Sequence, residues 1–232
     1  MKKENKRVKE FGKLFDKKKE YTLEEIIFIL KKAPRVKFDE SVDIAVHLGV
    51  DPKQSDQAVR GNVILPHGLG KKVRVAVFCK GEETNAAKEA QADYVGGQEL
   101  IEKVKTGWLE FDIAVATPEM MKDLAKLGKI LGPRGLMPSP RAGTVTPNVA
   151  KAVKEAKAGK VEFKMNKLAG IHVSVGKISF SDEALAENAK TVIDAIVKAK
   201  PQTAKGQYIK SIFLSTTMGP GVKLDSSEYK TV

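Results

Sequence analysis

The residues best suited to chemistry lie where the last strand-like stretch of the chain meets a Met-Gly-Pro-Gly sequence at 218–221. Side chains in a strand alternate between faces, so Ser211, Ser215 and Thr217 should share one surface. Hydroxyl groups suit riboses, and Gly219 lets the backbone approach a partner without a side chain in the way. The spacing therefore predicts a docking edge for RNA.

Charge along this stretch is consistent with that prediction. No acidic residue lies between Lys210 and Lys223 in the sequence, and both lysines would attract a polyanion. A core strand that ends in a Gly/Pro turn is the alternative interpretation.

The whole chain is strongly basic. Its 232 residues include 41 Lys and Arg against 29 Asp and Glu, which gives a formal charge of +12 and favours a polyanionic partner. The basic residues of the N-terminal arm either follow a phosphate backbone or form a solvated face. They are Lys2, Lys3, Lys6, Arg7, Lys9, Lys13 and Lys17 to Lys19.

Other chemistries find little support. Cys79 is the single cysteine, and His47, His67 and His172 lack companions at the spacing of a metal site or a catalytic triad. We therefore expect no metal, no cofactor and no enzymatic activity. The start lacks the apolar core of a signal peptide and no stretch is long enough to span a bilayer, so we expect a cytoplasmic protein without a membrane partner.

The central part of the chain has a parallel βαβ rhythm. Short apolar strands are expected at 73–78, 92–95 and 111–116, with helical segments between them. This pattern predicts a small Rossmann-like domain over 66–159. No Gly-x-Gly-x-x-Gly follows the first strand, so a nucleotide site is not expected.

The flanking parts alternate polar and apolar residues, as half-buried strands do. Helices are expected at 23–32, begun by the capping box of Thr22 and Glu25, and at 183–200, capped by Ser181. Together they predict a discontinuous α+β domain, 1–65 plus 160–232, with an antiparallel sheet and helices on one face. The fold class is thus α/β with two domains. The open face should carry Glu162, Lys164, His172, Ser174, Ser211, Ser215 and Thr217.

Two loops are rich in glycine. Residues 61–72 are expected to form the linker into the central domain, since the spacing of a phosphate loop is absent. The loop at 131–143, with Arg134 and Arg141, either contacts an RNA backbone or forms a rigid connection.

Five motifs in this order over nearly the whole length resemble the bacterial ribosomal protein L-one family. They are Lys37-Phe38-Asp39-Glu40, Ser55-Asp56-Gln57-Ala58-Val59-Arg60-Gly61, Leu65-Pro66-His67-Gly68-Leu69-Gly70-Lys71, Leu131-Gly132-Pro133-Arg134-Gly135 and Thr216-Thr217-Met218-Gly219-Pro220. The resemblance implies a two-domain protein of the mobile stalk of the large ribosomal subunit, beside the site from which deacylated tRNA leaves. It also implies repression of translation through the protein's own mRNA leader, and a protein that is monomeric when free.

Carried over by position, the family's RNA contacts fall on Lys37, Phe38, Ser211, Thr217, Met218 and Gly219. To these the alternation adds His172 and Lys164. Two rival functions remain at this stage: a nucleotide-dependent enzyme built on the βαβ domain, and a general basic binder that compacts DNA.

Overall fold

The computed structural model describes residues 10–12, 14–16, 19–34, 36–81, 83–140, 142–204 and 206–229, without the side chains of Ser55 and Glu228. It is a mixed α/β structure, as the sequence predicted. The chain divides into two compact units, Met1–Gly70 with Val161–Val232, and Lys71–Lys160.

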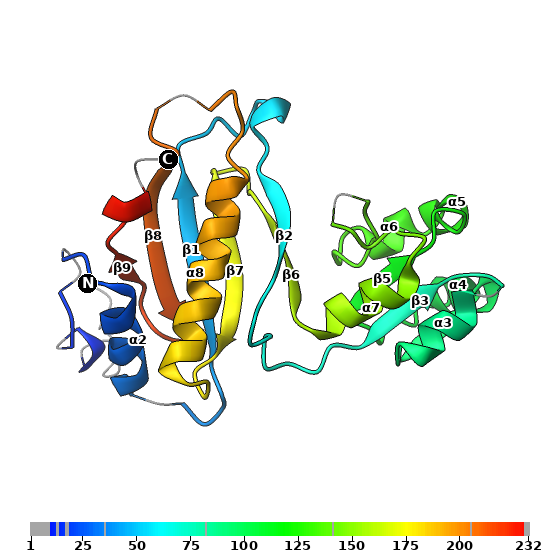
Figure 1. Cartoon of the computed structure of the whole chain (residues 1–232), viewed down its shortest axis with the longest axis horizontal. Coiled ribbons are helices and arrows are strands. Elements are labelled where there is room, and N and C mark those ends of the chain that lie inside the picture. Colours follow the sequence, from blue (N-terminus) through cyan, green and yellow to red (C-terminus); the bar gives the residue numbers. More distant parts are fainter. Residues whose placement is uncertain are drawn as a thin grey trace. The chain divides into compact units, whose positions relative to one another are not determined.

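The first unit contains a four-stranded sheet in the order β7–β1–β8–β9. The strands β1 (Ser41–Leu48), β7 (Gly170–Lys177), β8 (Ile209–Thr216) and β9 (Val222–Leu224) pair antiparallel throughout (Figure 1). Every second side chain of β1 is buried, as the alternation predicted. The core side of the sheet includes Val42, Ile44, Val46, Leu48, Ile171, Val173, Val175, Ile212 and Leu214.

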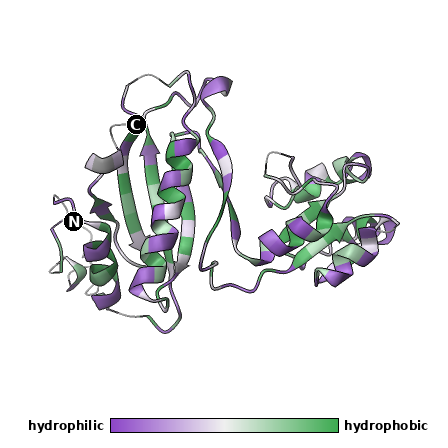
Figure 2. Cartoon of the chain, in the orientation of Figure 1, coloured by the Kyte–Doolittle hydropathy of each residue, from purple (hydrophilic) through white to green (hydrophobic). Residues whose placement is uncertain are grey.

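Two helices cover this apolar side. Helix α2 (Leu23–Lys32) has the predicted bounds, and both hydrogen bonds of its capping box are present. Helix α8 (Asp182–Lys198) begins at the predicted cap, where the Ser181 hydroxyl accepts from the Ala184 N–H at 3.3 Å. It ends earlier than expected, because Pro201 disfavours helical backbone in the residue before it. Figure 2 shows the strands in the green of apolar residues and α8 in alternating green and purple.

A two-stranded sheet of β2 (Arg60–Ile64) and β6 (Lys160–Lys164) is separate from the four-stranded one. This corrects two predictions. Residues 60–64 form a strand and not a linker, and Lys164 and Glu162 are exposed on this two-stranded sheet and not on the open face of the larger one. Alternation shows which side of a strand is polar, but it cannot show which strand is the neighbour.

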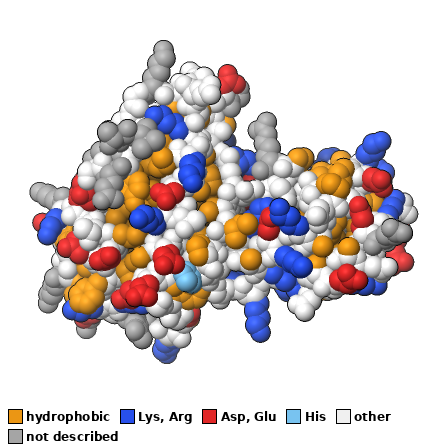
Figure 3. All heavy atoms as spheres, in the orientation of Figure 1, with side chains coloured by type: hydrophobic (Ala, Val, Ile, Leu, Met, Phe, Trp, Pro, Cys, Tyr) orange, Lys and Arg blue, Asp and Glu red, His pale blue; other side chains and the backbone are white. Residues whose placement is uncertain are grey.

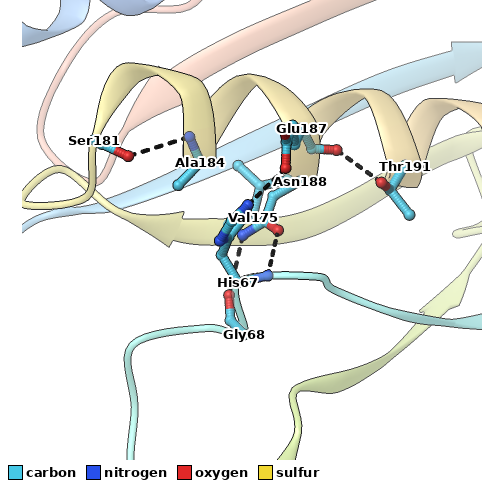
Figure 4. A network of polar contacts seen from close by, with 8 residues as sticks. All are labelled: His67, Gly68, Val175, Ser181, Ala184, Glu187, Asn188 and Thr191. Atoms are coloured by element: carbon cyan, nitrogen blue, oxygen red, sulfur yellow. Dashed lines mark hydrogen bonds and ion pairs between the residues drawn. The ribbon is translucent and has the colours of Figure 1, made fainter.

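A buried asparagine attaches the segment after β2 to α8 (Figure 4). Asn188 is fully buried; its Oδ1 accepts from the His67 N–H at 3.1 Å, and its Nδ2 donates to the carbonyls of Gly68 at 3.1 Å and Val175 at 2.8 Å. The His67 ring lies 2.6 Å from the Glu187 carboxylate. Because a buried amide must satisfy its polar atoms, these bonds fix the segment to both helix and sheet.

The link between α8 and β8 is also fixed from within. The Tyr208 hydroxyl donates to the Ile196 carbonyl at 3.0 Å, and burial raises the pKa of Tyr208 to about 12. The phenol therefore holds α8 and the start of β8 together as a neutral donor.

The second unit has the predicted parallel sheet, in the order β4–β3–β5, with strands shorter than expected: β3 (Val75–Phe78), β4 (Tyr94–Gly96) and β5 (Ile113–Ala116). Its helices are α3 (Glu83–Glu89), α4 (Gln98–Lys105), α5 (Met121–Ala125), α6 (Gly128–Leu131) and α7 (Val149–Lys157). Alternate residues of β3 enter two hydrophobic clusters, so this strand is buried on both faces. The first unit also contains two short 3-10 turns, Ser55–Gln57 and Ser227–Tyr229.

Candidate nucleic-acid interface

The end of β8 is fastened to the start of β1 by the hydroxyl of Thr217. Its Oγ1 accepts from the Ser41 N–H at 2.9 Å and donates to the Ser41 carbonyl at 3.3 Å, and the Thr217 N–H donates to that same carbonyl at 3.0 Å. The hydroxyl predicted to contact riboses is therefore already engaged inside the protein. In this position Thr217 sets the path of the residues that follow it.

The next residue is held by a buried carboxylate. Glu40 is only 4% exposed, and its Oε1 accepts from the Met218 N–H at 3.0 Å. The Glu40 carbonyl accepts from the Ile178 N–H at 2.9 Å, so the same residue joins three segments. A charge-assisted hydrogen bond in a buried position fixes the backbone of this turn more firmly than a neutral one does.

Residues 177–179 support the segment that leads into β1. The Lys177 Nζ donates to the Asp39 carbonyl at 3.2 Å and to Ser41 Oγ at 3.0 Å. The Ser179 hydroxyl donates to an Asp39 carboxylate oxygen at 2.8 Å. Residues 39–41, 177–179 and 217–218 thus form one hydrogen-bonded rim, which we call the sheet-end rim.

Apolar and basic side chains are exposed beside this rim. The Met218 side chain is 59% exposed and the Phe38 side chain 54% exposed, and Lys37 is also exposed. A fixed backbone that presents a thioether, an aromatic ring and an ammonium group to solvent is suited to a partner with bases, sugars and phosphates. The structure brings Lys37, Phe38, Thr217, Met218 and Gly219 to the same end of the sheet.

Gly219 is required by its neighbours in the protein. A Cβ at this position would lie 2.4 Å from Thr216 Oγ1 and 3.4 Å from the Phe11 ring. Real Cβ atoms do not approach an oxygen so closely, so a side chain would displace the turn. The sequence predicted a glycine that lets this backbone approach a partner closely. In the structure, the space that a side chain would need is taken by Thr216 and Phe11 of the protein itself.

The other predicted residues lie farther along the same open face. Ser211 pairs with His47 at the opposite end of β8, and Ser215 pairs with Asp43. His172 is exposed on β7 opposite Ala45, in the same cross-strand row as Phe213. The placement of Ser211, Ser215, Thr217 and His172 on one face is thus confirmed.

Asp43 on β1 and Glu40 just before it correct the expected charge of this surface. Asp43 is partly exposed on the open face between Ser174 and Ser215, and Glu40 contacts Met218. The segment between Lys210 and Lys223 lacks acids in sequence, but β1 and the residue before it bring two carboxylates next to it. Binding here cannot rest on positive charge alone, which favours a role for shape and hydrogen bonding.

Lys177 is a member of the rim that alternation missed. The buried residues Val173 and Val175 would place Lys177 on the core side, but the register with β1 shifts at Val42 and Asp43, and beyond the shift Lys177 pairs with Ser41. Gly176 was the available signal, because glycine within a strand often marks a bulge. A Cβ there would lie 3.0 Å from the Phe180 ring.

Two further candidates fall elsewhere. Arg134 is exposed, in a loop whose Leu136 and Met137 pack on the core of the second unit, which is consistent with a rigid connection. Arg141 lies outside the described residues, as do the basic residues of the arm apart from Lys19, which is exposed. In the part of the chain that the structure describes, no group of three His, Cys, Asp or Glu residues is placed to hold a metal ion. None of the described helices has the length and apolar character that crossing a membrane requires.

Comparisons with known proteins agree with the fold and the sequence motifs. The model of the Ribosomal protein L1p/L10e family matches residues 30–220. The chain is 54% identical over 224 residues to the large ribosomal subunit protein uL1 of Protochlamydia amoebophila (strain UWE25), an alignment that covers 97% of this chain and 95% of that protein.

Proposed function

The chain belongs to the Ribosomal protein L1p/L10e family and is a protein of the large ribosomal subunit. From this we propose that it binds a folded ribosomal RNA through its open sheet face and forms the mobile stalk. The role is non-enzymatic. The discontinuous unit, 1–65 plus 160–232 in the predicted division, is the proposed RNA-binding domain, and 66–159 the inserted one.

The sheet-end rim is the observation that carries this proposal. Hydrogen bonds at 2.8–3.3 Å fix its backbone before any partner arrives. Next to it, Met218 and Phe38 expose more than half of their surface. Preorganised apolar groups gain affinity because little conformational entropy is lost when they are covered. Exposed apolar side chains on a rigid rim are what a ligand with flat bases and sugars requires.

Each proposed contact has a distinct physical role. Lys37 attracts phosphate, and Phe38 and Met218 pack on a base or a sugar. Ser211 and His172 extend the contact along the open face, while Thr217 and Gly219 act by shaping the turn. Lys164 lies on the separate two-stranded sheet, so it joins only if the RNA extends beyond the larger sheet.

The finer biological roles are part of the same proposal. On the ribosome, one domain holds the stalk RNA while the other assists the release of deacylated tRNA from the exit site. Away from the ribosome, the monomeric protein in the cytoplasm binds its own mRNA leader and represses translation. One RNA-binding surface serves both roles if the mRNA leader imitates the ribosomal site.

Binding to a large-subunit RNA fragment from the stalk region tests this function. Affinity should be measured at about 0.1 M and 0.5 M salt with excess tRNA as competitor, because contacts to phosphate alone weaken steeply with salt. The wild-type protein should retain a specific complex at the higher salt, and Met218→Ala and Phe38→Ala should each weaken it by roughly 1–3 kcal/mol. Lys122→Ala, on the second unit, is the control.

Two results would count against the proposal. If all variants bind alike and dissociate together as salt rises, binding reflects counterion release and the general basic binder is the better description. If duplex DNA of equal length competes as well as the stalk RNA, the surface does not read RNA structure.

A further inference from the structure

The helix layer of the first unit contains a groove on the side opposite to the open sheet face. Its volume is about 620 Å³, and it lies between α2 and α8. The residues that line it are Glu24, Glu25, Ile27, Phe28, Asp182, Glu183, Ala186 and Glu187. Figure 3, which views this side, shows carboxylates around hydrophobic side chains over the ends of the two helices. The lining is therefore acidic and apolar in a chain of charge +12.

Part of the acidity has a structural explanation. Acidic side chains in the first turn stabilise a helix through its dipole, and four of the carboxylates occupy such positions. Glu25 caps α2, Asp182 pairs with Lys31, and Glu187 pairs with His67. Among the residues that the structure describes, the side chains of Glu24 and Glu183 have no hydrogen-bond or ion-pair partner. Both are exposed at the groove and available to a partner.

Phe28 has no comparable structural explanation. It is 54% exposed, while Ile27 beside it is buried at 2%. Its ring already contacts a cation, because the Lys32 Nζ lies 4.0 Å from the ring centroid. Because Lys32 already supplies the cation, the exposed part of the ring favours an apolar side chain, and the carboxylates around it favour Lys or Arg in the same partner segment.

We propose that this groove docks a short basic segment of another protein, with Lys or Arg side chains for Glu24 and Glu183 and an apolar side chain over Phe28. Charge complementarity selects this occupant. A nucleic acid would be repelled by the carboxylates, and an acidic or neutral segment would leave them without partners. Because the groove and the open sheet face lie on opposite sides, RNA and the basic segment can bind together.

The probe is a fluorescent twelve-residue peptide of Lys, Arg, Ala and two Leu residues, titrated with the full chain and followed by anisotropy. A second peptide with both Leu residues replaced by Ser keeps the charge but lacks the apolar side chains proposed to lie over Phe28. The groove variants are Glu24→Gln with Glu183→Gln, and Phe28→Ser. Glu89→Gln with Glu99→Gln, on exposed positions of the second unit, is the matched control for net charge.

The groove variants should weaken binding of the Leu peptide at least about tenfold at about 0.15 M salt, and the control pair should change it less than about twofold. The Ser peptide should bind at least about tenfold more weakly than the Leu peptide.

Several outcomes would overturn the proposal. Equal losses in the groove pair and the control pair would mean attraction by net charge alone. Equal binding of the Leu and Ser peptides would mean that the segment makes no apolar contact with Phe28. If removal of residues 1–9 tightened binding more than about tenfold, the chain's own arm and not a partner protein would be the occupant.

Discussion

Replacing Thr217 by valine separates two explanations of this residue's importance. Valine has nearly the same shape but lacks the hydroxyl, so the bonds of 2.9 Å and 3.3 Å to Ser41 disappear. Because the rim is exposed, water replaces part of these hydrogen bonds in the variant. The free energy that holds the turn in its position should therefore fall by roughly 1–2 kcal/mol. If that turn presents Met218 to RNA, affinity should fall about fivefold to thirtyfold.

The assay is a double-mutant cycle in stalk-RNA binding. Thr217→Val, Met218→Ala and the double variant are compared with wild type, and Thr217→Ser, which keeps the hydroxyl, is the control. We expect Thr217→Ser to bind nearly as wild type. The double variant should lose less than the sum of the single losses by at least about 0.5 kcal/mol, because Thr217 acts through the position of Met218.

Additive losses would refute this reasoning. They would mean that the Thr217 hydroxyl contacts RNA independently of its bonds to Ser41. Wild-type affinity in Thr217→Val would refute it in another way, since the hydrogen bonds of the rim would then contribute nothing to binding.

Three further predictions concern stability. Asn188→Asp places a carboxylate against buried carbonyls and should lower the free energy of unfolding by roughly 3 kcal/mol in urea denaturation, whereas Lys190→Gln, on the exposed side of α8, should change it little. Gly219→Ala should cost about 1–3 kcal/mol in thermal unfolding, and Thr216→Ala in the same chain should recover part of it, since the clash is with the Thr216 hydroxyl. Tyr208, with a pKa raised to about 12, favours the neutral phenol in the folded state, so its contribution is complete below pH 10 and is lost as pH rises from 10 to 12. Between pH 9 and pH 11 the wild type should lose on the order of 1 kcal/mol more than Tyr208→Phe, and parallel curves would contradict the assignment.

Local patterns predicted most elements correctly. Helix α2 was placed to the residue, because the capping box at Thr22 and Glu25 and the apolar spacing are contained in one short segment. The same holds for the core side of β1 and β8, where strict alternation reports burial directly. Strand β2 was missed, because its glycine and asparagine weaken the signal of a strand and only pairing with β6 reveals it.

The candidate site was predicted only in part, because its motifs are local in sequence but several of its contacts join distant segments. Phe38 and Met218 were found from motifs, and both are exposed in the structure. The roles of Thr217 and Gly219 were not, because these depend on Ser41 and Thr216 being in contact. Lys177 and Asp43 reach the site through strand pairing across more than a hundred residues, and no local window contains such information.

The sequence by itself determined most of the segments that form helices and strands, which of their sides are apolar, and the family to which the chain belongs, because periodicity, caps and motifs are properties of neighbouring residues. The tertiary structure decided which strands are neighbours, and therefore that Glu40, Lys177 and Thr217 form one rim and that Asp43 lies on the open face. The physical reason is that strand register and bulges are fixed by packing and hydrogen bonds between distant segments, whose energies depend on the whole unit being folded.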